Sequence, residues 1–138
     1  MAVMQFGSRH GTVTLGGSSG RIQGIEQALR YVRNVTARHE QIAEQMIVAE
    51  ALKIFNESQF LCPIDKGLLR ASGDIVVKGK GFKTVVYIIY GMYYAIYVHE
   101  DPIAHHDPPT SWKYVEIPMR KYGPGVVGRI RKEFQRRQ

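Results

Sequence analysis

The sequence predicts an α+β fold: a long helix pair packed on a small antiparallel β-sheet with a C-terminal helix. Three observations support this class. Apolar residues recur at three- and four-residue steps from Ile22 to about residue 59, which is the helical period. Two β-rich runs follow, separated by turn residues at 78–81. A second helical pattern, Val126 to Phe134, comes last, so helices and strands are segregated along the chain.

Composition indicates one globular domain and excludes several classes. The chain has 138 residues, of which 44% are hydrophobic, enough for one core. No apolar run approaches the roughly 20 residues of a membrane-spanning helix, and the first residues lack the apolar stretch of a signal peptide. Cys62 is the only cysteine, which excludes an intramolecular disulfide and a four-cysteine zinc site. These features favour a protein that folds inside a cell.

Residues 1–20 differ in composition from the rest of the chain. They are rich in glycine and serine, and only Thr12 to Leu15 resemble a strand. Such a segment has too few apolar groups to offset the entropy of ordering it. We therefore predict a flexible arm over 1–20, ordered by contact with a partner protein, and a single α+β domain over 21–138.

The helical region is predicted as two helices, over 22–34 and 37–59, because β-branched residues cluster near 34–36. The longer helix is apolar on most of its girth and needs cover on more than one side. We expect its own sheet on one side and another subunit on the other. Glu50 falls inside the main apolar face. The favoured interpretation is a carboxylate that reaches water from the rim, and the alternative is an ion pair across a subunit interface.

The stretch CPIDKGLLRASG, residues 62–73, predicts a sharp chain reversal that we call the elbow. Pro63 cannot continue a helical hydrogen-bond ladder and should end the long helix. Asp65 is placed to cap a single helical turn over 66–70, in which Gly67 permits a tight approach. We expect the side chains of Leu68 and Leu69 to point into the core and that of Arg70 to point to solvent.

The sheet is predicted as a hairpin of two strands, residues 75–77 and 82–90, joined by the Lys-Gly-Lys-Gly turn at 78–81. Residues 93–99 fit either a third strand or a helical turn. Their alternation favours the strand slightly.

The remainder of the chain reads as a loop and two helical pieces. The loop, residues 100–110, is rich in proline. Ser111 is expected to cap a turn, and Pro118 to open the next helical piece as its first residue. Gly-Pro-Gly at 123–125 then separates this piece from the final amphipathic helix.

Four tyrosines lie close together between positions 90 and 97. Packing of a small sheet accounts for two of them. Tyrosine is also enriched in protein interfaces, which is the favoured explanation for the others, and it stacks on nucleic-acid bases. The residues we select as candidates for a subunit or partner interface are Tyr93, Tyr94, Tyr97, His99, Glu50 and Trp112.

The formal net charge is +7, and much of the excess lies near the end of the chain. The simplest interpretation is a solvated helix end whose charge complements the helix dipole. The alternatives are an acidic partner protein, or DNA held through its phosphates without base preference. The candidate residues for either contact are Arg129, Arg131, Lys132, Arg136 and Arg137.

One constellation fits metal chemistry by residue type: His99-Glu100-Asp101 with His105-His106-Asp107. Adjacent histidines in a loop diverge unless the backbone folds back, so a solvated polar loop is preferred over an adventitious metal site. Cys62 has no adjacent base and should be a small buried hydrophobic residue. We therefore predict no cofactor, no metal and no enzymatic activity.

Three segments resemble one protein family. PIDKGLLRAS at 63–72 is similar to the P-V-D-T-G-x-L-R-x-S signature of the neck, or tail-completion, proteins of tailed bacteriophages. YAIYVHE at 94–100 resembles the family's Y-A-x-Y-V-E/H segment, and KYVEIPM at 113–119 its K-F-L-E-x-P-L segment. Lys66 departs from the usual threonine. The resemblance extends from Ile22 to Phe134 and leaves out the glycine-rich arm.

The resemblance implies a non-enzymatic structural protein of the virion. Members of this family form a ring in the neck, where the head connector meets the tail. It implies as partners further copies of the chain, in a hexamer or dodecamer, together with neck, connector, tail-terminator or tail-tube proteins. It also implies contact with genomic DNA that passes through the ring, and no contact with a membrane. The expected location is the virion neck, after folding and assembly in the host cytoplasm; the alternative function is a small basic nucleic-acid-binding protein.

Overall fold

The computed structural model describes residues 12–15, 18–21, 24–104 and 106–137, with side chains from Gly24 onward. The chain divides into two compact units, residues 1–38 and 39–138. Both helices and an antiparallel sheet are present, so the predicted α+β class is confirmed. In the part of the chain that the structure describes, none of the helices combines the length and the hydropathy needed to cross a membrane.

The first unit contains a short hairpin and the start of α1. Strands β1 (Thr12–Leu15) and β2 (Ser18–Arg21) pair antiparallel, with Thr12 opposite Arg21. The strand predicted at Thr12–Leu15 is confirmed, and its serine-rich partner strand was not predicted. Residues 1–11 and 16–17, which make up the rest of the expected arm, lie outside the described residues.

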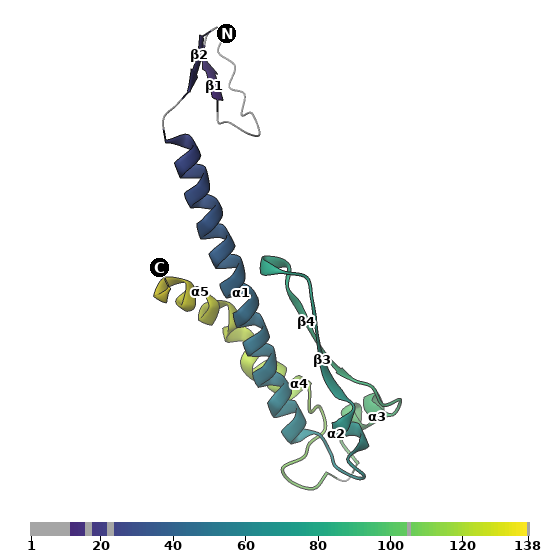
Figure 1. Ribbon diagram of the computed structural model, residues 1–138. Helices are drawn as coiled ribbons and strands as arrows, with labels where there is room; N and C mark the ends of the chain where they lie inside the picture. The colour runs from purple at the N-terminus through teal and green to yellow at the C-terminus, as the bar shows by residue number, and fades with distance from the viewer. Residues whose placement is uncertain (1–11, 16–17, 22–23, 105, 138) are drawn as a thin grey trace. The chain divides into compact units, whose positions relative to one another are not determined.

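Helix α1 is one continuous helix, Ile25–Leu61 (Figure 1). The predicted break near 34–36 is wrong. This stretch contains neither proline nor glycine, and each β-branched residue in a helix costs only about 0.5 kcal/mol relative to alanine. The C-terminal end is as expected, because α1 stops at Leu61, two residues before Pro63.

The elbow leads into a two-stranded sheet. Helix α2 (Leu68–Ala71) is followed by β3 (Gly73–Lys78), the 3₁₀ turn η1 (Gly81–Lys83) and β4 (Val85–Tyr90). The strands pair antiparallel with Ile75 opposite Ile88, which confirms the predicted hairpin. The second strand begins three residues later than predicted because η1 occupies its expected start.

Residues 95–100 form helix α3 (Ala95–Glu100), so the favoured third strand is wrong. The helical alternative places Tyr94 and Val98 one turn apart, and both pack against a buried cluster that includes Ala95. Four-residue spacing brings side chains to one helix face, whereas a strand would present them in alternation.

Helices α4 (Glu116–Tyr122) and α5 (Val126–Arg136) flank the 3₁₀ turn η2 (Gly123–Gly125). Pro118 is the third residue of α4 instead of the first, and it is buried. Its missing N–H is still harmless there, because the first-turn N–H groups of a helix have no intrahelical partner. The turn expected after Ser111 is present at residues 112–115, and the Ser111 N–H donates to the Leu61 carbonyl oxygen at 2.9 Å.

A cluster of buried residues lies at the C-terminal end of α1 in the second unit. It consists of Cys62, Leu69, Ala95 and Tyr114. The Tyr114 hydroxyl donates to the Ala95 carbonyl oxygen at 3.2 Å, and its ring lies edge-on to Tyr90 at 5.0 Å. Cys62 is fully buried as predicted, and this burial raises the pKa of its thiol to about 11.

Within the second unit, the sheet and α5 both cover α1 (Figure 1). Tyr90 of β4 lies 6.5 Å from Phe55, centroid to centroid, and its hydroxyl is 2.7 Å from Ser58 Oγ. On α5, Phe134 stacks on His39 at 5.0 Å. α5 of the same chain thus supplies a second cover that the sequence did not predict, while Leu52 and Phe60 of α1 stay exposed, and the expected cover by another subunit stays a prediction.

Candidate assembly surfaces

The elbow is held by Arg70 and not by Asp65. Arg70 Nη2 donates to the carbonyl oxygens of Phe60 (3.3 Å), in the last turn of α1, and of Cys62 (2.8 Å), the residue after α1. A guanidinium at this position satisfies free carbonyl groups and complements the helix dipole. The prediction that Arg70 points to solvent is therefore wrong. Asp65 is exposed, and no side-chain hydrogen bond caps α2, so its predicted capping role is wrong as well.

Gly67 and the two leucines define the geometry of α2. Gly67 is the N-cap residue with φ 75°, a left-handed conformation that favours glycine. A Cβ here would touch nothing within 4 Å, so backbone conformation, and not a tight approach, explains this glycine. Leu69 is buried as predicted, but Leu68 is 54% exposed and does not point inward. In a four-residue helix two adjacent side chains cannot share one face.

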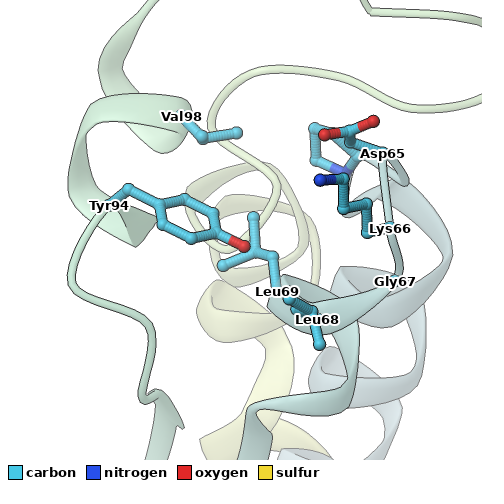
Figure 2. A pocket seen from close by; sticks show the side chains of 8 residues that line it. Asp65, Lys66, Gly67, Leu68, Leu69, Tyr94 and Val98 are labelled. Atoms are coloured by element: carbon cyan, nitrogen blue, oxygen red, sulfur yellow. The ribbon is translucent and has the colours of Figure 1, made fainter.

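A pocket opens between the elbow and α3 (Figure 2). Its volume is about 440 Å³, and we call it the elbow pocket. Leu69, Tyr94 and Val98 point toward one another on one side, and Asp65 and Lys66 lie across from them. The complete lining consists of Pro63, Asp65, Lys66, Gly67, Leu68, Leu69, Tyr94 and Val98.

The tyrosines divide between the core and the surface. Tyr90 is part of the core, and Tyr94 is half-buried at the elbow pocket. Tyr93 and Tyr97 are 86% and 72% exposed. Two tyrosines are thus available to a partner, in agreement with the division that the sequence predicts.

Further apolar side chains are exposed on the segments that contribute to the elbow pocket and next to them. They come from the elbow, from the turn before α3, from α3 and from the loop after it: Ile64, Leu68, Tyr93, Ile96, Tyr97 and Ile103. Together with the pocket they form what we call the elbow surface. Clustered large apolar side chains of this kind mark sites of contact with another macromolecule.

The other selected interface residues have different surroundings. His99 is largely buried, stacks edge-on against Tyr114 at 5.0 Å, and its Nδ1 lies 2.8 Å from Glu100 Oε1. It therefore supports the core and presents little surface to a partner. Trp112 is 37% exposed, with the Lys113 ammonium 5.3 Å from its ring centroid, and stays an interface candidate.

Glu50 forms ion pairs within its own chain. The carboxylate therefore neither reaches water from the rim nor pairs across a subunit interface, and both predictions are wrong. It is only 2% exposed; Arg129 Nη2 donates to its Oε2 at 2.6 Å and Lys53 Nζ to its Oε1 at 2.9 Å. The Arg129 guanidinium is the main reason that the pKa of Glu50 lies below its usual value. Arg129 also donates to the Tyr122 carbonyl oxygen at 2.7 Å. Arg129 therefore joins α5 to α1.

The remaining basic residues of α5 differ in pairing. Arg136 and Arg137 both bind Glu133, at 2.7 and 2.5 Å. Arg131 and Lys132 are exposed and have no ion-pair partner among residues 24–104 and 106–137. Two of the five predicted cations are thus free to contact an anionic partner.

The histidine loop shows no metal-binding geometry in its described part. His106 Nε2 lies 3.2 Å from the Asp101 carbonyl oxygen, and Asp101 Oδ1 accepts the backbone N–H of Ile103 at 2.9 Å. The described residues contain no group of three histidine, cysteine, aspartate or glutamate side chains that would hold a metal ion. His105 lies outside the described residues.

One exposed group was not selected from the sequence. Phe82, at the hairpin turn, is 59% exposed and stands among exposed Lys78, Lys80 and Lys83. The sequence places Phe82 at the start of a β-rich run, so it was predicted as a strand residue. The glycines on both sides of Lys80 could have indicated that Phe82 belongs to the turn instead, because Gly79 (φ 79°) and Gly81 (φ 57°) turn the chain directly before it.

Comparisons of the chain with protein-family models, with curated proteins and with solved structures find no match.

Proposed function

We propose that this chain is a structural subunit of a bacteriophage neck, where a ring of copies joins the head connector to the tail. The observation that carries the proposal is the elbow pocket. Two of the segments that resemble the family, residues 63–72 and 94–100, meet there, and Tyr114 of the third segment packs in the core beside them. Residues distant in sequence thus build one open apolar surface.

The elbow surface supports a role in protein assembly. It offers large aromatic and aliphatic side chains on a frame held by buried Leu69 and by the Arg70 hydrogen bonds. Rigid aromatic side chains around an apolar pocket are the usual anchors of protein interfaces. In a closed ring, two different surfaces of each subunit must match, so this surface would meet another part of a neighbouring copy.

The expected partners are further copies of the chain, as a hexamer or dodecamer by family resemblance, and connector, neck, tail-terminator or tail-tube proteins. Free Arg131 and Lys132 are available to passing genomic DNA or to an acidic partner. The protein would act in the virion neck without catalysis, cofactor or membrane.

The experiment that tests this function is deletion of the gene in the phage that encodes the chain. We expect filled heads and separate tails in electron micrographs, and joined virions when the chain is supplied from a plasmid. Joined, infectious virions at normal yield without the chain would contradict the proposal.

A nucleic-acid-binding protein is the second candidate, favoured by one observation: Lys78, Lys80 and Lys83 are gathered at a hairpin turn with exposed Phe82. Such a protein would bind DNA at physiological salt with an affinity that falls steeply as salt rises. If DNA mobility is unchanged by the chain at that ionic strength, this candidate is excluded.

A further inference from the structure

The hairpin turn holds Phe82 in an outward position. Within η1, the Lys83 N–H donates to the Lys80 carbonyl oxygen at 3.0 Å. The Gly81 N–H donates to Glu44 Oε2 of α1, also at 3.0 Å, and a Cβ on Gly81 would lie 3.0 Å from the Glu40 Cβ. The turn is therefore fastened to the helix while the Phe82 ring is left in solvent. An aromatic side chain that is already ordered loses little entropy when it is buried in a partner.

The elbow pocket offers a matching site. Its apolar side consists of Leu69, Tyr94 and Val98, and its volume of about 440 Å³ exceeds that of one aromatic side chain (Figure 2). The space left beside an inserted ring would admit the aliphatic stems of neighbouring lysines, whose ammonium groups stay in water.

The two regions carry net charges of opposite sign. Residues 78–83 contain three lysines and no acid, and Glu40 and Glu44 of α1, which lie against Gly81, offset part of this positive charge. Residues 84–112 contain no lysine or arginine and three acids, Glu100, Asp101 and Asp107, and Asp65 adds a carboxylate at the pocket itself. Lys66 and Arg70 offset part of this negative charge. Opposite charge on two surfaces aligns partners and speeds their association.

The two regions cannot meet within one copy. The hairpin turn lies beside Glu40 and Glu44, whereas the elbow follows Leu61 at the other end of this part of α1 (Figure 1). A helix rises 1.5 Å per residue, which separates Glu44 from Leu61 by about 25 Å. The turn of one copy can therefore enter only the pocket of another.

We propose that the hairpin turn of one copy docks in the elbow pocket of the next, with the Phe82 ring against the apolar side formed by Leu69, Tyr94 and Val98. Lys80 and Lys83 then face Asp65 and Asp101 of the neighbour. This inference rests on the proposed function, because it names the contact that builds the ring. The contact joins two different surfaces, so each copy keeps a free turn or a free pocket for the next copy until the ring closes.

Directed disulfide cross-linking tests this contact. Phe82→Cys and Leu68→Cys are made in separate chains; both sites are exposed, so both variants should fold. Natural Cys62 is fully buried and stays unreactive. The two variants are mixed under mild oxidation at millimolar concentration, where weak contacts are populated. Val127→Cys, 70% exposed on α5, replaces Leu68→Cys in the control mixture.

We expect mixed dimers of the Phe82→Cys and Leu68→Cys chains in at least about tenfold excess over those of the control mixture. Dimers of Phe82→Cys with itself in similar amount would overturn the inference, because they indicate a two-fold contact. Equal cross-linking in both mixtures, or none in either, would overturn it too. Neither result bears on the proposed function, which depends on whether virions join without the chain.

A charge exchange provides a second test by native mass spectrometry. Lys80→Glu with Lys83→Glu should weaken self-association about tenfold or more, and Asp65→Lys with Asp101→Lys in a second chain should restore assembly of the mixture. Arg131→Glu with Lys132→Glu on α5, outside both regions and without ion-pair partners among residues 24–104 and 106–137, is the control. If the variant with Lys80→Glu and Lys83→Glu self-associates as strongly as the wild-type chain, the proposed contact is contradicted.

Discussion

Leu68 and Leu69 are neighbours in α2, and their surroundings are opposite. Leu69 is 5% exposed and packs with Cys62, Ala95 and Tyr114, whereas Leu68 is 54% exposed at the rim of the elbow pocket. The inner side of the elbow is closed by packing and hydrogen bonds of the same chain. The outer side leaves comparable apolar groups without cover. The inner side therefore stabilises the fold, and we propose the outer side as the contact with a partner.

The largest expected effect is on the inner side. Leu69→Ala should lower the free energy of unfolding by about 2–5 kcal/mol, through lost burial and the cavity left in the core. Denaturant unfolding measures this loss. The matched control is Leu68→Ala, for which we expect a change within about 0.5 kcal/mol. Equal losses in the two variants would remove the distinction between the sides.

The next effect concerns the buried carboxylate of Glu50. Its pKa is lowered first by the Arg129 hydrogen bond and then by Lys53, so the ionised form stabilises the fold above the unfolded value of 4.5. Stability from this group should be lost as the pH falls through the lowered pKa. In Glu50→Gln that loss should be absent. We therefore expect the difference in free energy of unfolding between wild type and Glu50→Gln, measured by denaturant unfolding, to decrease below pH 4.5. A difference that stays constant with pH would contradict the ion pair between Glu50 and Arg129.

A smaller effect is expected at the hydrogen bond between Ser58 and Tyr90. The two hydroxyl oxygens lie 2.7 Å apart, and Ser58 is fully buried. Ser58→Ala should cost about 1 kcal/mol. Asn56→Ala, at an exposed position of the same helix, should cost clearly less. Additive losses in Ser58→Ala and Tyr90→Phe, measured as a double-mutant cycle, would show that the two groups do not interact.

The smallest effect is expected on the outer side, at Asp65. Its carboxylate caps no helix, so Asp65→Ala should change the free energy of unfolding by less than about 0.5 kcal/mol. The sequence alone predicts a loss of about 1 kcal/mol, as for a helix cap. Thermal melting of this variant separates the two expectations, and a loss at the higher value would restore the capping role.

The sequence predicted much of the fold where local chemistry decides it. Pro63 ends α1 and the glycines at 79 and 81 turn the hairpin, because both effects act through the backbone of the residue itself. The break expected near Thr36 failed because β-branched propensity is weak within a long helix. The favoured strand at 93–99 failed because the packing of Tyr94 and Val98 on the core decides between two allowed patterns.

The candidate surfaces were less predictable, since they depend on contacts between distant residues. The pairing of Glu50 with Arg129 joins positions far apart in the chain and converts an expected interface group into a structural one. The exposure of Phe82 depends on where Glu44 holds the turn. Tyr93 and Tyr97, which were selected as interface candidates, are exposed. Their number exceeded what a small core needs, a signal that the sequence does contain.

The central claim is that the outer side of the elbow assembles the neck. Its most direct test supplies Leu68→Glu, from a plasmid, to the phage that lacks the gene. We predict a variant that melts at the wild-type temperature and leaves heads and tails unjoined in electron micrographs. Joined virions at the wild-type yield with folded Leu68→Glu would contradict the account.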